Sequence, residues 1–548
     1  MTVAHLADLD ARYDPDARMP WCHATGPGYH TRVPEGARAH QTREAADYAL
    51  ALLRHGAADR VDRAHQVLDA LVDLQVTDPL ADHYGIWGWF LEEPPQQMRP
   101  ADWNWADFIG VRLAQVLAVH AGQLPPALAA RVRAALRHAA MAIFRRNVDA
   151  GYTNIAVMGA VTCAAAGELL DLPLLLEYGR ARLAAVLALR ERIGGFTEYN
   201  SPAYHRVVLE ELERAALIVA DRECRDLAEQ LRALTWAALA ERFHPGTGQL
   251  AGPMSRAYHD WLQPDLVDYL AARTGAAITA RTRQAGRPAS DLVPPLPCPA
   301  DVAPRFHALP AAPTQLRTRF NEQTGGVTWL ADDACLGSAD EEFAWTQRRP
   351  LLGYWRTSED PAVLLRARML LDGHDLSAAW CRQAQDGPRV LSAWWLSYDS
   401  GDFHPALDKP AGSIFTLSDL RLAVCLRGLG VRGSDLGGGR FALTAGGWSA
   451  VVHTVAATFL GGEVTWQVDN RDGEARVEAV LHRGETRQVD LHTATLHAGF
   501  AIELVPAGCT PAPHELLHTR GEVEHHWRWG DLAVRVPALP TPFARSRP

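Results

Sequence analysis

Residues 194–207, GGFTEYNSPAYHRV, combine side chains that can move protons with the pattern of a helix start. Ser201 followed by Pro202 is typical of an N-cap and a first helical residue. The groups predicted on or beside this helix start are Glu198, Tyr199, Asn200, Tyr204 and His205. A helix N-terminus attracts negative charge, so it would favour an anionic ligand and a tyrosinate, and would disfavour a protonated imidazole.

Tyr204 and His205 also have a purely structural interpretation. Adjacent helical residues point about 100° apart, so one side chain can pack inward while the other meets solvent. Both need not reach one substrate.

Asn154 lies in GYTNIAVMGAVTCAAAG, residues 151–167, just ahead of a long apolar stripe. Asparagine is a poor residue for a helix interior, so it is expected here either as a cap or for its side-chain amide. The capping alternative stays open, because Thr153 and Asn154 together precede the stripe.

Residues 82–108, DHYGIWGWFLEEPPQQMRPADWNWADF, set four tryptophans among several acids. Burying an unpaired carboxylate is costly, whereas a sugar-binding cleft uses aromatic faces for stacking and carboxylates for hydroxyl groups. The residues predicted to bind a sugar are Trp87, Glu92, Asp102, Trp103, Trp105 and Asp107. The alternative is a long loop pinned by tryptophans, with its acids in water.

The second half of the chain adds three candidates. His374 and His404 lie in turn-like contexts beside Asp375 and Asp402, which could orient an imidazole. Arg348 could bind a carboxylate, although a solvated arginine is equally expected.

Several function classes lose support. The net charge of −10 argues against a nucleic-acid partner. The eight cysteines are isolated and predict neither a disulfide framework nor a metal site. GLGVRG at 428–433 matches a dinucleotide fingerprint without its strand–helix context, and no P-loop, GxSxG or HExxH is present. No cofactor is expected.

The elements that must position these groups change in kind along the chain. Apolar residues recur at helical spacing through most of the first 275 residues, including 38–54, 58–75, 105–121, 173–192, 204–220, 223–243 and 257–273. Successive helices with short connections pack as antiparallel hairpins, and enough pairs form an incomplete α/α toroid. An open helical array fits nearly as well.

Beyond this region the period falls from about four to two. Ala475, Val477, Ala479 and Leu481 alternate with other residues, as expected for an antiparallel β-sandwich. A proline-rich stretch separates the two patterns. We therefore predict a helical toroid domain at 1–286, a linker at 287–313 and a β-sandwich domain at 314–548.

A helical first half, a proline-rich joint and a β-sandwich second half resemble the heparinase II/III and alginate lyase group of polysaccharide lyases. Members carry an asparagine on a toroid helix and a tyrosine, sometimes beside a histidine, some fifty residues later, often with a further histidine from the β domain. Asn154 and Tyr204 match this spacing, His205 adjoins Tyr204, and His404 or His374 would be the late histidine.

The resemblance implies β-elimination at a uronate unit of an acidic oligosaccharide or polysaccharide. An amide such as Asn154 would neutralise the carboxylate, a tyrosine or histidine would remove the C5 proton, and a tyrosine would return a proton to the leaving oxygen.

Two alternatives remain. One is an inverting glycoside hydrolase using two carboxyl groups about 6.5–9.5 Å apart, and the other is a non-catalytic carbohydrate-binding protein. The N-terminal residues show no basic segment followed by an apolar one and no spanning run occurs, so a cytoplasmic protein without membrane contact is expected.

Overall fold

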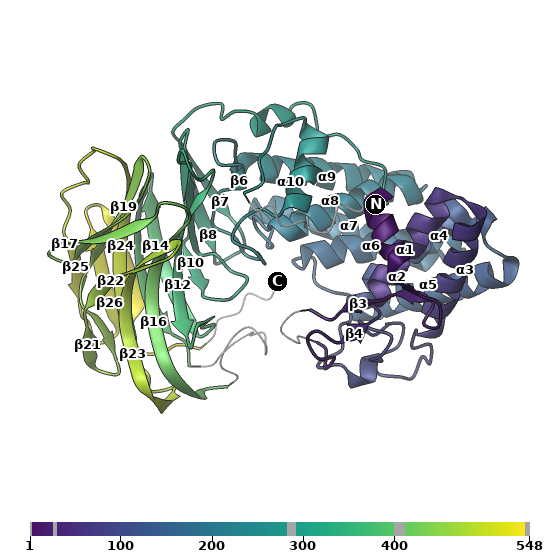
Figure 1. Ribbon diagram of the computed structural model, residues 1–548, viewed down its shortest axis with the longest axis horizontal. Helices are drawn as coiled ribbons and strands as arrows, with labels where there is room; N and C mark the ends of the chain where they lie inside the picture. Colours follow the sequence, from purple (N-terminus) through teal and green to yellow (C-terminus); the bar gives the residue numbers. More distant parts are fainter. Residues whose placement is uncertain (1–2, 26–29, 282–291, 399–411, 543–548) are drawn as a thin grey trace.

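The helical and β-rich halves lie at opposite ends of the molecule (Figure 1). The structure is a computed structural model that describes residues 3–25, 30–281, 292–398 and 412–542. The predicted order of a helical region followed by an antiparallel β region is confirmed.

The helical half consists mainly of α-helices of 9 to 21 residues. These are α1 (Val3–Ala11), α2 (Thr42–His55), α3 (Ala58–Asp73), α4 (Trp105–His120), α5 (Pro126–Arg146), α6 (Thr153–Leu169), α7 (Pro173–Ile193), α8 (Pro202–Ile218), α9 (Arg222–Arg242) and α10 (Pro264–Thr274). Short 3₁₀ turns are η1 (Pro95–Gln97), η2 (Ala121–Gln123) and η3 (Ala303–Phe306). Two-residue strands pair as β1 (Tyr13–Asp14) with β2 (Met19–Pro20), β3 (Cys22–His23) with β4 (Arg38–Ala39), and β5 (Phe243–His244) with β6 (Gln249–Leu250).

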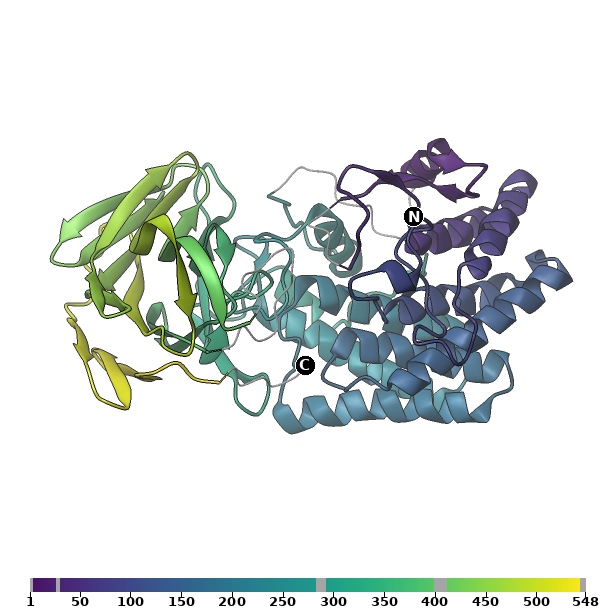
Figure 2. The same ribbon diagram turned by 90° about the horizontal axis from the view of Figure 1, so that it is seen from below.

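Helices α2 to α9 form a two-layered arc, as in an incomplete α/α toroid (Figure 2). Helices α2, α4, α6 and α8 pack side by side in the inner row, and α3, α5, α7 and α9 cover them outside. Helix α6 is buried from Thr153 to Gly167, as expected for a helix that is apolar on every face. Since consecutive helices alternate in direction, the inner helices run parallel and begin at the same end of the arc.

The β half contains two large antiparallel sheets that share one apolar core. One sheet has the order β10 (Glu341–Phe343), β14 (Ala379–Asp386), β15 (Arg389–Leu396), β24 (Leu496–Pro506), β19 (Trp448–Thr454), β18 (Arg440–Ala445), β17 (Arg432–Gly437), with β20 (Ala457–Phe459) and β21 (Gly462–Val464) attached. The other has the order β22 (Trp466–Arg471), β23 (Glu474–Asp490), β16 (Ile414–Arg427), β12 (Val363–Leu371), β11 (Leu351–Trp355), β9 (Ala334–Ala339), β8 (Gly325–Leu330), β7 (Thr314–Arg319), with β13 (His374–Asp375) attached. A third, three-stranded sheet is formed by β25 (Leu516–Thr519), β26 (Glu524–Trp529) and β27 (Leu532–Pro537).

The period-two pattern on β23 corresponds to burial in this sandwich. Ala475, Val477, Ala479 and Leu481 all belong to the core between the two large sheets. Apolar residues on alternate positions of a strand face the same side, so one side of β23 can close the core.

The predicted helix at 257–273 begins later than expected, at Pro264. The preceding residues are not helical because they bind the β half. Met254 and Arg349 exchange two backbone hydrogen bonds, and the amide of Ala257 donates to the carbonyl of Gln347 at 2.7 Å. The chain from 251 to 262 therefore connects the helical arc to the loop between β10 and β11.

Buried charges reinforce this connection. The Asp260 carboxylate accepts hydrogen bonds from Arg349 at 2.8 Å, Arg366 at 3.0 Å and Arg427 at 2.9 Å. Burial opposes ionisation of Asp260, but the three guanidinium groups together hold its pKa below the ordinary range. Among the helices of the described ranges, none is long and apolar enough to cross a membrane.

Candidate active site

The loop before α8 and the segment after α9 contact the β half, and polar side chains gather beside them. The Tyr204 hydroxyl, in the first turn of α8, lies 2.6 Å from the Tyr258 hydroxyl. The same oxygen accepts a hydrogen bond from Arg256 Nη2 at 3.0 Å. Tyr204 is half-buried, whereas Tyr258 is 51% exposed, so the pair joins the protein interior to solvent.

The predicted start of this helix is confirmed. Ser201 is the N-cap and its hydroxyl accepts from the Tyr204 amide at 3.3 Å, with Pro202 as the first helical residue. The helix end was also expected to favour a tyrosinate, and this expectation was wrong. Burial raises the pKa of Tyr204 well above its usual value, and Arg256 offsets this rise only in part. Desolvation of the phenolate therefore outweighs the attraction of the helix end and of the guanidinium.

Asn154 and Glu198 form a second part of the cluster. The Asn154 backbone amide donates to Glu198 Oε2 at 2.8 Å, and its side-chain amide donates to both carboxylate oxygens at 2.9 Å. Each residue is only 2% exposed. Burial raises the pKa of Glu198, while Arg256 and Asn154 oppose the rise. Asn154 lies in the first turn of α6, so the amide bonds a buried acid there.

Tyr152 and Asn104 extend the cluster towards α4. The Tyr152 hydroxyl accepts from Asn104 Nδ2 at 3.2 Å, and the Asn104 carbonyl oxygen accepts from Arg146 at 2.7 Å. Burial raises the pKa of Tyr152 to about 12, with Arg256 opposing and Glu198 reinforcing the rise. These electrostatic couplings connect Tyr152 to the same guanidinium that binds Tyr204.

Arg256 is oriented by the β half. Its Nε donates to Gln347 Oε1 at 2.8 Å, and its guanidinium carbon lies 5.0 Å from the Tyr204 ring centroid and 5.1 Å from that of Trp345. Gln347 is buried, and its backbone also binds Ala257. The loop between β10 and β11 therefore fixes the cation that contacts Tyr204.

Sequence analysis missed Tyr152, Arg256, Tyr258 and Gln347. Tyr152 lies two residues before Asn154, and a search of the residues flanking the helix start would have found it. Arg256 directly precedes the stretch expected to be helical and Tyr258 lies in it, and local sequence carries no signal for the bond from Arg256 to Gln347 in the β half.

Tyr199 and Asn200, predicted to bind substrate, are buried inside the joint between the two halves. The Tyr199 hydroxyl donates to Glu342 at 2.7 Å, and its ring stacks on Phe320 at 3.8 Å. Asn200 has a φ of +46° and donates its amide to the Pro253 carbonyl at 2.9 Å. Both side chains hold the loop before α8, which corrects their predicted role.

Arg348, another predicted substrate-binding residue, pairs with the buried Glu342. Its guanidinium also lies over the Phe343 ring at 4.5 Å. Arg348 therefore binds a carboxylate, as predicted, but the carboxylate is that of Glu342 on the adjoining strand β10.

His205 points away from Tyr204. It is 3% exposed, lies beside Phe196, and neither ring nitrogen has a hydrogen-bond partner within the described part of the chain. Burial and the nearby Arg242 lower the pKa of His205 to about 3. The 100° rotation between neighbouring helical positions separates these two predicted catalytic residues.

The tryptophans of the segment predicted to form a sugar cleft make contacts within the protein, and their role in sugar binding stays a prediction. Trp87 is fully buried and donates its indole N–H to the Leu71 carbonyl at 2.8 Å. The half-buried Trp105 stacks on Trp89 at 5.1 Å and donates to the Thr42 hydroxyl, while Trp103 stacks on His83. These rings pack against protein groups.

The predicted acids of this segment are also bonded. Glu92 contacts the His40 ring nitrogen at 2.5 Å, and Asp102 accepts from the Trp89 indole at 3.1 Å. Asp107 is buried, and the loss of solvent raises its pKa to about 7, although Arg146 lies 3.9 Å away.

Of the two histidines predicted in the β half, the structure describes only His374, which does not join the cluster. His374 is exposed on β13, and the neighbouring Asp375 binds Arg368 at 2.9 Å and not the imidazole. His404 lies outside the described residues.

Comparison with known proteins gives a family match for the helical half and fold likenesses for the whole chain. Residues 6–278 match the family model described as a domain of unknown function, DUF8769. No curated protein matches the sequence.

Similar solved structures include heparinase III, with 10% identity and a TM-score of 0.43 over 98% of this chain and 91% of that one. Chondroitin AC lyase of Streptomyces coelicolor A3 has 11% identity and a TM-score of 0.49, covering 97% of this chain and 84% of that chain. A Paenibacillus xanthan lyase has 8% identity and a TM-score of 0.34 over 96% and 73% of the two chains. The chain is thus similar in structure, along nearly its whole length, to proteins named as polysaccharide lyases.

Proposed function

We propose that this protein is a lyase that cleaves a uronate-containing glycan by β-elimination, with Tyr204 transferring the proton. The observation that carries the proposal is the hydroxyl pair of Tyr204 and Tyr258, 2.6 Å apart, with Arg256 bonded to the Tyr204 oxygen. Two phenols and one cation at a single point are suited to holding and returning a proton.

The reaction first requires a neutralised carboxylate, because the C5 proton of a uronate is otherwise hardly acidic. Arg256 can supply positive charge, and the Asn154 amide would have to leave Glu198 before it could donate to that carboxylate. Burial raises the pKa of Glu198, which reduces the cost of placing a second carboxylate beside it. Asn154, Glu198 and Arg256 are the proposed carboxylate-binding groups.

The proton transfer follows from the phenol pair. Tyr204 gives up its own proton through Tyr258 towards solvent, and the phenolate is stabilised by Arg256. The phenolate oxygen then removes the C5 proton, the electrons of that C–H bond form the C4–C5 double bond, and the bond from C4 to its oxygen breaks. Tyr204 returns the proton to the departing oxygen and is a phenolate again.

A hydrolase is less well supported by the same residues. Inverting hydrolysis needs one carboxylic acid and one carboxylate facing the substrate. Glu92, Glu93 and Asp102 instead bond to protein groups, Glu93 through Thr31 at 2.5 Å. These three acids are therefore already engaged, whereas the phenol pair is not bonded to any carboxylate in the described hydrogen bonds.

The test is a screen of uronate-containing oligosaccharides for ultraviolet absorbance, because elimination creates a C4–C5 double bond and hydrolysis does not. Tyr204→Phe should lose turnover by about 10³-fold or more while retaining ligand binding. Tyr178→Phe, on the outer helix α7, is the matched control and should keep full activity. New reducing ends without absorbance, or an active Tyr204→Phe protein, would refute the proposal.

A further inference from the structure

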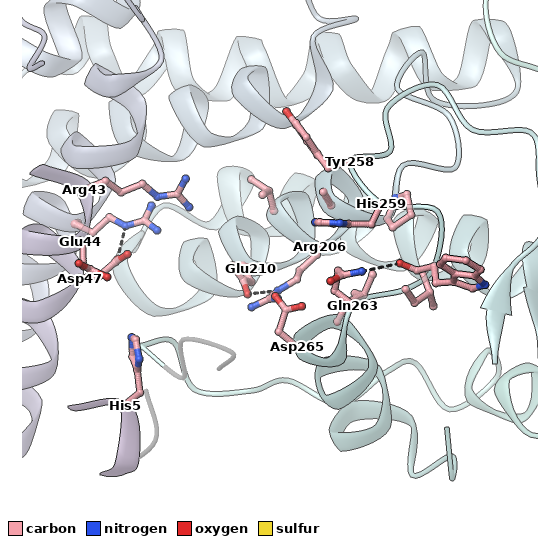
Figure 3. Close-up of a pocket in the computed structure, with 17 residues that line it drawn as sticks. His5, Arg43, Glu44, Asp47, Arg206, Glu210, Tyr258, His259, Gln263 and Asp265 are labelled. Atoms are coloured by element: carbon pink, nitrogen blue, oxygen red, sulfur yellow. Dashed lines mark hydrogen bonds and ion pairs between the residues drawn. The ribbon is translucent and has the colours of Figure 1, made fainter. Parts of the chain in front are cut away.

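Titratable side chains gather in two contrasting surroundings in this protein. In a cavity of about 450 Å³ beside Tyr258, acids lie next to guanidinium groups, as Glu210 does to Arg206, so the charges are balanced (Figure 3). That cavity borders the candidate active site. At the far side of the β half, by contrast, histidines contact one another beneath β25–β27, which we call the terminal sheet (Figure 1). Within the described ranges, no carboxylate is hydrogen-bonded to those rings.

Three imidazole rings lie in contact between the terminal sheet and the large sheet beneath it. The ring of His497, on β24, stacks on that of His525, on β26, with 3.7 Å between centroids. The Nδ1 atom of His525 lies 2.9 Å from Nε2 of His518 on β25. His518 stacks in turn on Trp527 at 3.9 Å. His497 and His525 are each only 7% exposed, so the cluster is largely out of water.

This geometry limits how many protons the cluster can hold. The contact between His518 and His525 is an N–H···N bond, in which one ring donates and the other must accept, so one of the two rings is neutral. His497 donates from Nε2 to the Ala538 carbonyl at 3.0 Å, and its Nδ1 faces the uncharged Thr458 hydroxyl at 3.4 Å. A second proton on the bonded pair would set two N–H groups against each other.

The surroundings of the cluster also oppose positive charge. Burial lowers the pKa of all three rings, and those of His497 and His518 fall to about 4. The charged and titratable groups that face the cluster are Arg520 and His526, which lower these pKa values further. Glu463 does not offset this effect at the rings, because it binds Arg520 at 2.7 Å.

A fourth histidine lies beneath the same sheet. His453, on β19, is 6% exposed, and its ring centroid is 5.2 Å from that of Trp529 on β26. Its Nε2 atom has no hydrogen-bond partner among the residues that the structure describes. Burial lowers the pKa of His453 to about 4, and the nearby Arg440 and His514 add to this effect. The terminal sheet therefore covers imidazoles that are uncharged at neutral pH.

The terminal sheet is attached mainly by apolar side chains. Trp527 and Trp529 are fully buried in a cluster with Trp380 and Trp395 of the large sheet. Gly499 on β24 makes this close approach possible, because a Cβ atom there would lie 2.6 Å from the Trp527 ring. In the described structure, none of the three strands pairs with a strand of the large sheets. The terminal sheet can therefore separate without breaking a strand ladder.

We propose that the terminal sheet is an acid-sensitive flap, which docks while the histidines beneath it are neutral and separates when they take up protons. Separation returns the rings to water, where a histidine binds its proton near pH 6.5. Because the separated form then holds more protons than the docked form, lower pH favours separation. Trp345 belongs to the same apolar cluster and lies 5.1 Å from the Arg256 guanidinium carbon, so the movement would reach the candidate active site.

Hydrogen exchange of the full chain, followed by mass spectrometry at pH 7 and pH 5, tests the flap. After correction for the intrinsic effect of pH on exchange, the open population of residues 516–537 should rise roughly 10²-fold at pH 5. The strands β12 and β16 of the sandwich should keep their protection. Unchanged protection of the terminal sheet, or an equal loss in all of these strands, would overturn the proposal.

A double variant, His518→Phe with His525→Phe, should retain at pH 5 the protection that the wild type loses. The two substitutions remove both partners of the N–H···N bond together, and they keep aromatic faces against Trp527 and His497. The rise in open population between pH 7 and pH 5 should be at least about tenfold smaller than in the wild type. Misfolding cannot imitate retained protection.

The matched control is His526→Phe. His526 is exposed on β26, and neighbouring positions of a strand face opposite sides, so it points away from the large sheet. This variant should respond to acid within about threefold of the wild type. A double variant that loses protection at pH 5 as readily as the control would contradict the proposal.

Discussion

The tryptophan-rich segment at 82–108 and the starts of α6 and α8 both carry polar groups suited to sugar chemistry, yet the structure uses them differently. In the first region, carboxylates and indoles bond to nearby protein groups, as Glu92 does to His40. In the second, Tyr258 and Arg256 both bond to the Tyr204 hydroxyl, and Tyr258 is half-exposed. Residue type alone does not distinguish polar groups that stabilise a loop from polar groups that are available to a ligand.

The sharpest test of this contrast removes the cation. Arg256→Met keeps much of the side-chain volume but takes the charge and the hydrogen bond from Tyr204. Turnover should fall by about 10³-fold, because a buried phenolate without a cation is strongly disfavoured. The measurement is kcat from ultraviolet absorbance, with circular dichroism as the check on folding. A folded variant with wild-type kcat would place the chemistry elsewhere.

Gln347→Leu tests the contribution of the β half to that cation. Loss of the 2.8 Å bond should leave Arg256 misaligned and lower kcat by about 10–100-fold with KM nearly unchanged. Gln323→Leu, at an exposed position of the same half, is the control. A change in KM alone would indicate that Gln347 contributes only to binding.

The pH profile follows from the raised pKa of Tyr204. Since the reactive form is the phenolate, and burial holds the pKa above its usual value, the active fraction grows as pH rises. Between pH 7 and 10, kcat should increase by up to about tenfold per pH unit without reaching a plateau. A maximum near pH 5 or 6 would exclude Tyr204 as the base.

His205→Leu should affect stability and not chemistry. The folded pKa of His205, about 3, is below the usual value of about 6.5 for an unfolded chain. Below pH 6.5 the unfolded state therefore binds a proton that the folded state does not, and stability falls towards acid pH. The variant should lose part of that dependence, so its free energy of unfolding should drop less than the wild-type value between pH 7 and pH 5. A loss of kcat in a stable His205→Leu protein would indicate that His205 takes part in catalysis.

The smallest effect is expected in the tryptophan-rich segment. Glu92→Gln weakens the contact with His40. The Glu92 side chain is more than one-third exposed, so the free energy of unfolding should change by less than about 1 kcal/mol. Turnover should stay within about twofold of wild type. A large loss of kcat would mean that this loop, and not only the helix starts, contacts the substrate.

Much of the architecture could be predicted from periodicity. The helix start at Ser201 and Pro202 and the alternation on β23 depend on local geometry, which the sequence records directly. The start of α10 was wrong because the extended path before Pro264 is set by backbone bonds to residues about ninety positions later. The boundaries at 286 and 313 stay a prediction.

The site was only partly predictable for the same reason. Asn154 and Tyr204 lie in the first turns of α6 and α8, and Glu198 lies on the loop before α8, so local patterns pointed to all three; their catalytic roles stay predictions. Arg256 and Tyr258 complete the cluster only through tertiary contacts. The sequence analysis gave, as an alternative, that Tyr204 and His205 point in different directions. The structure has this arrangement, with His205 buried.

Because Gln347 follows Arg256 by 91 positions, the cluster cannot assemble while only the helical half has been synthesised. At about 5–20 residues per second, a ribosome needs roughly 5–20 s to add that stretch. During this interval the arc can fold with its tyrosines in place but with Arg256 unanchored. Under the proposed function, a chain that still lacks the sheet would have no turnover.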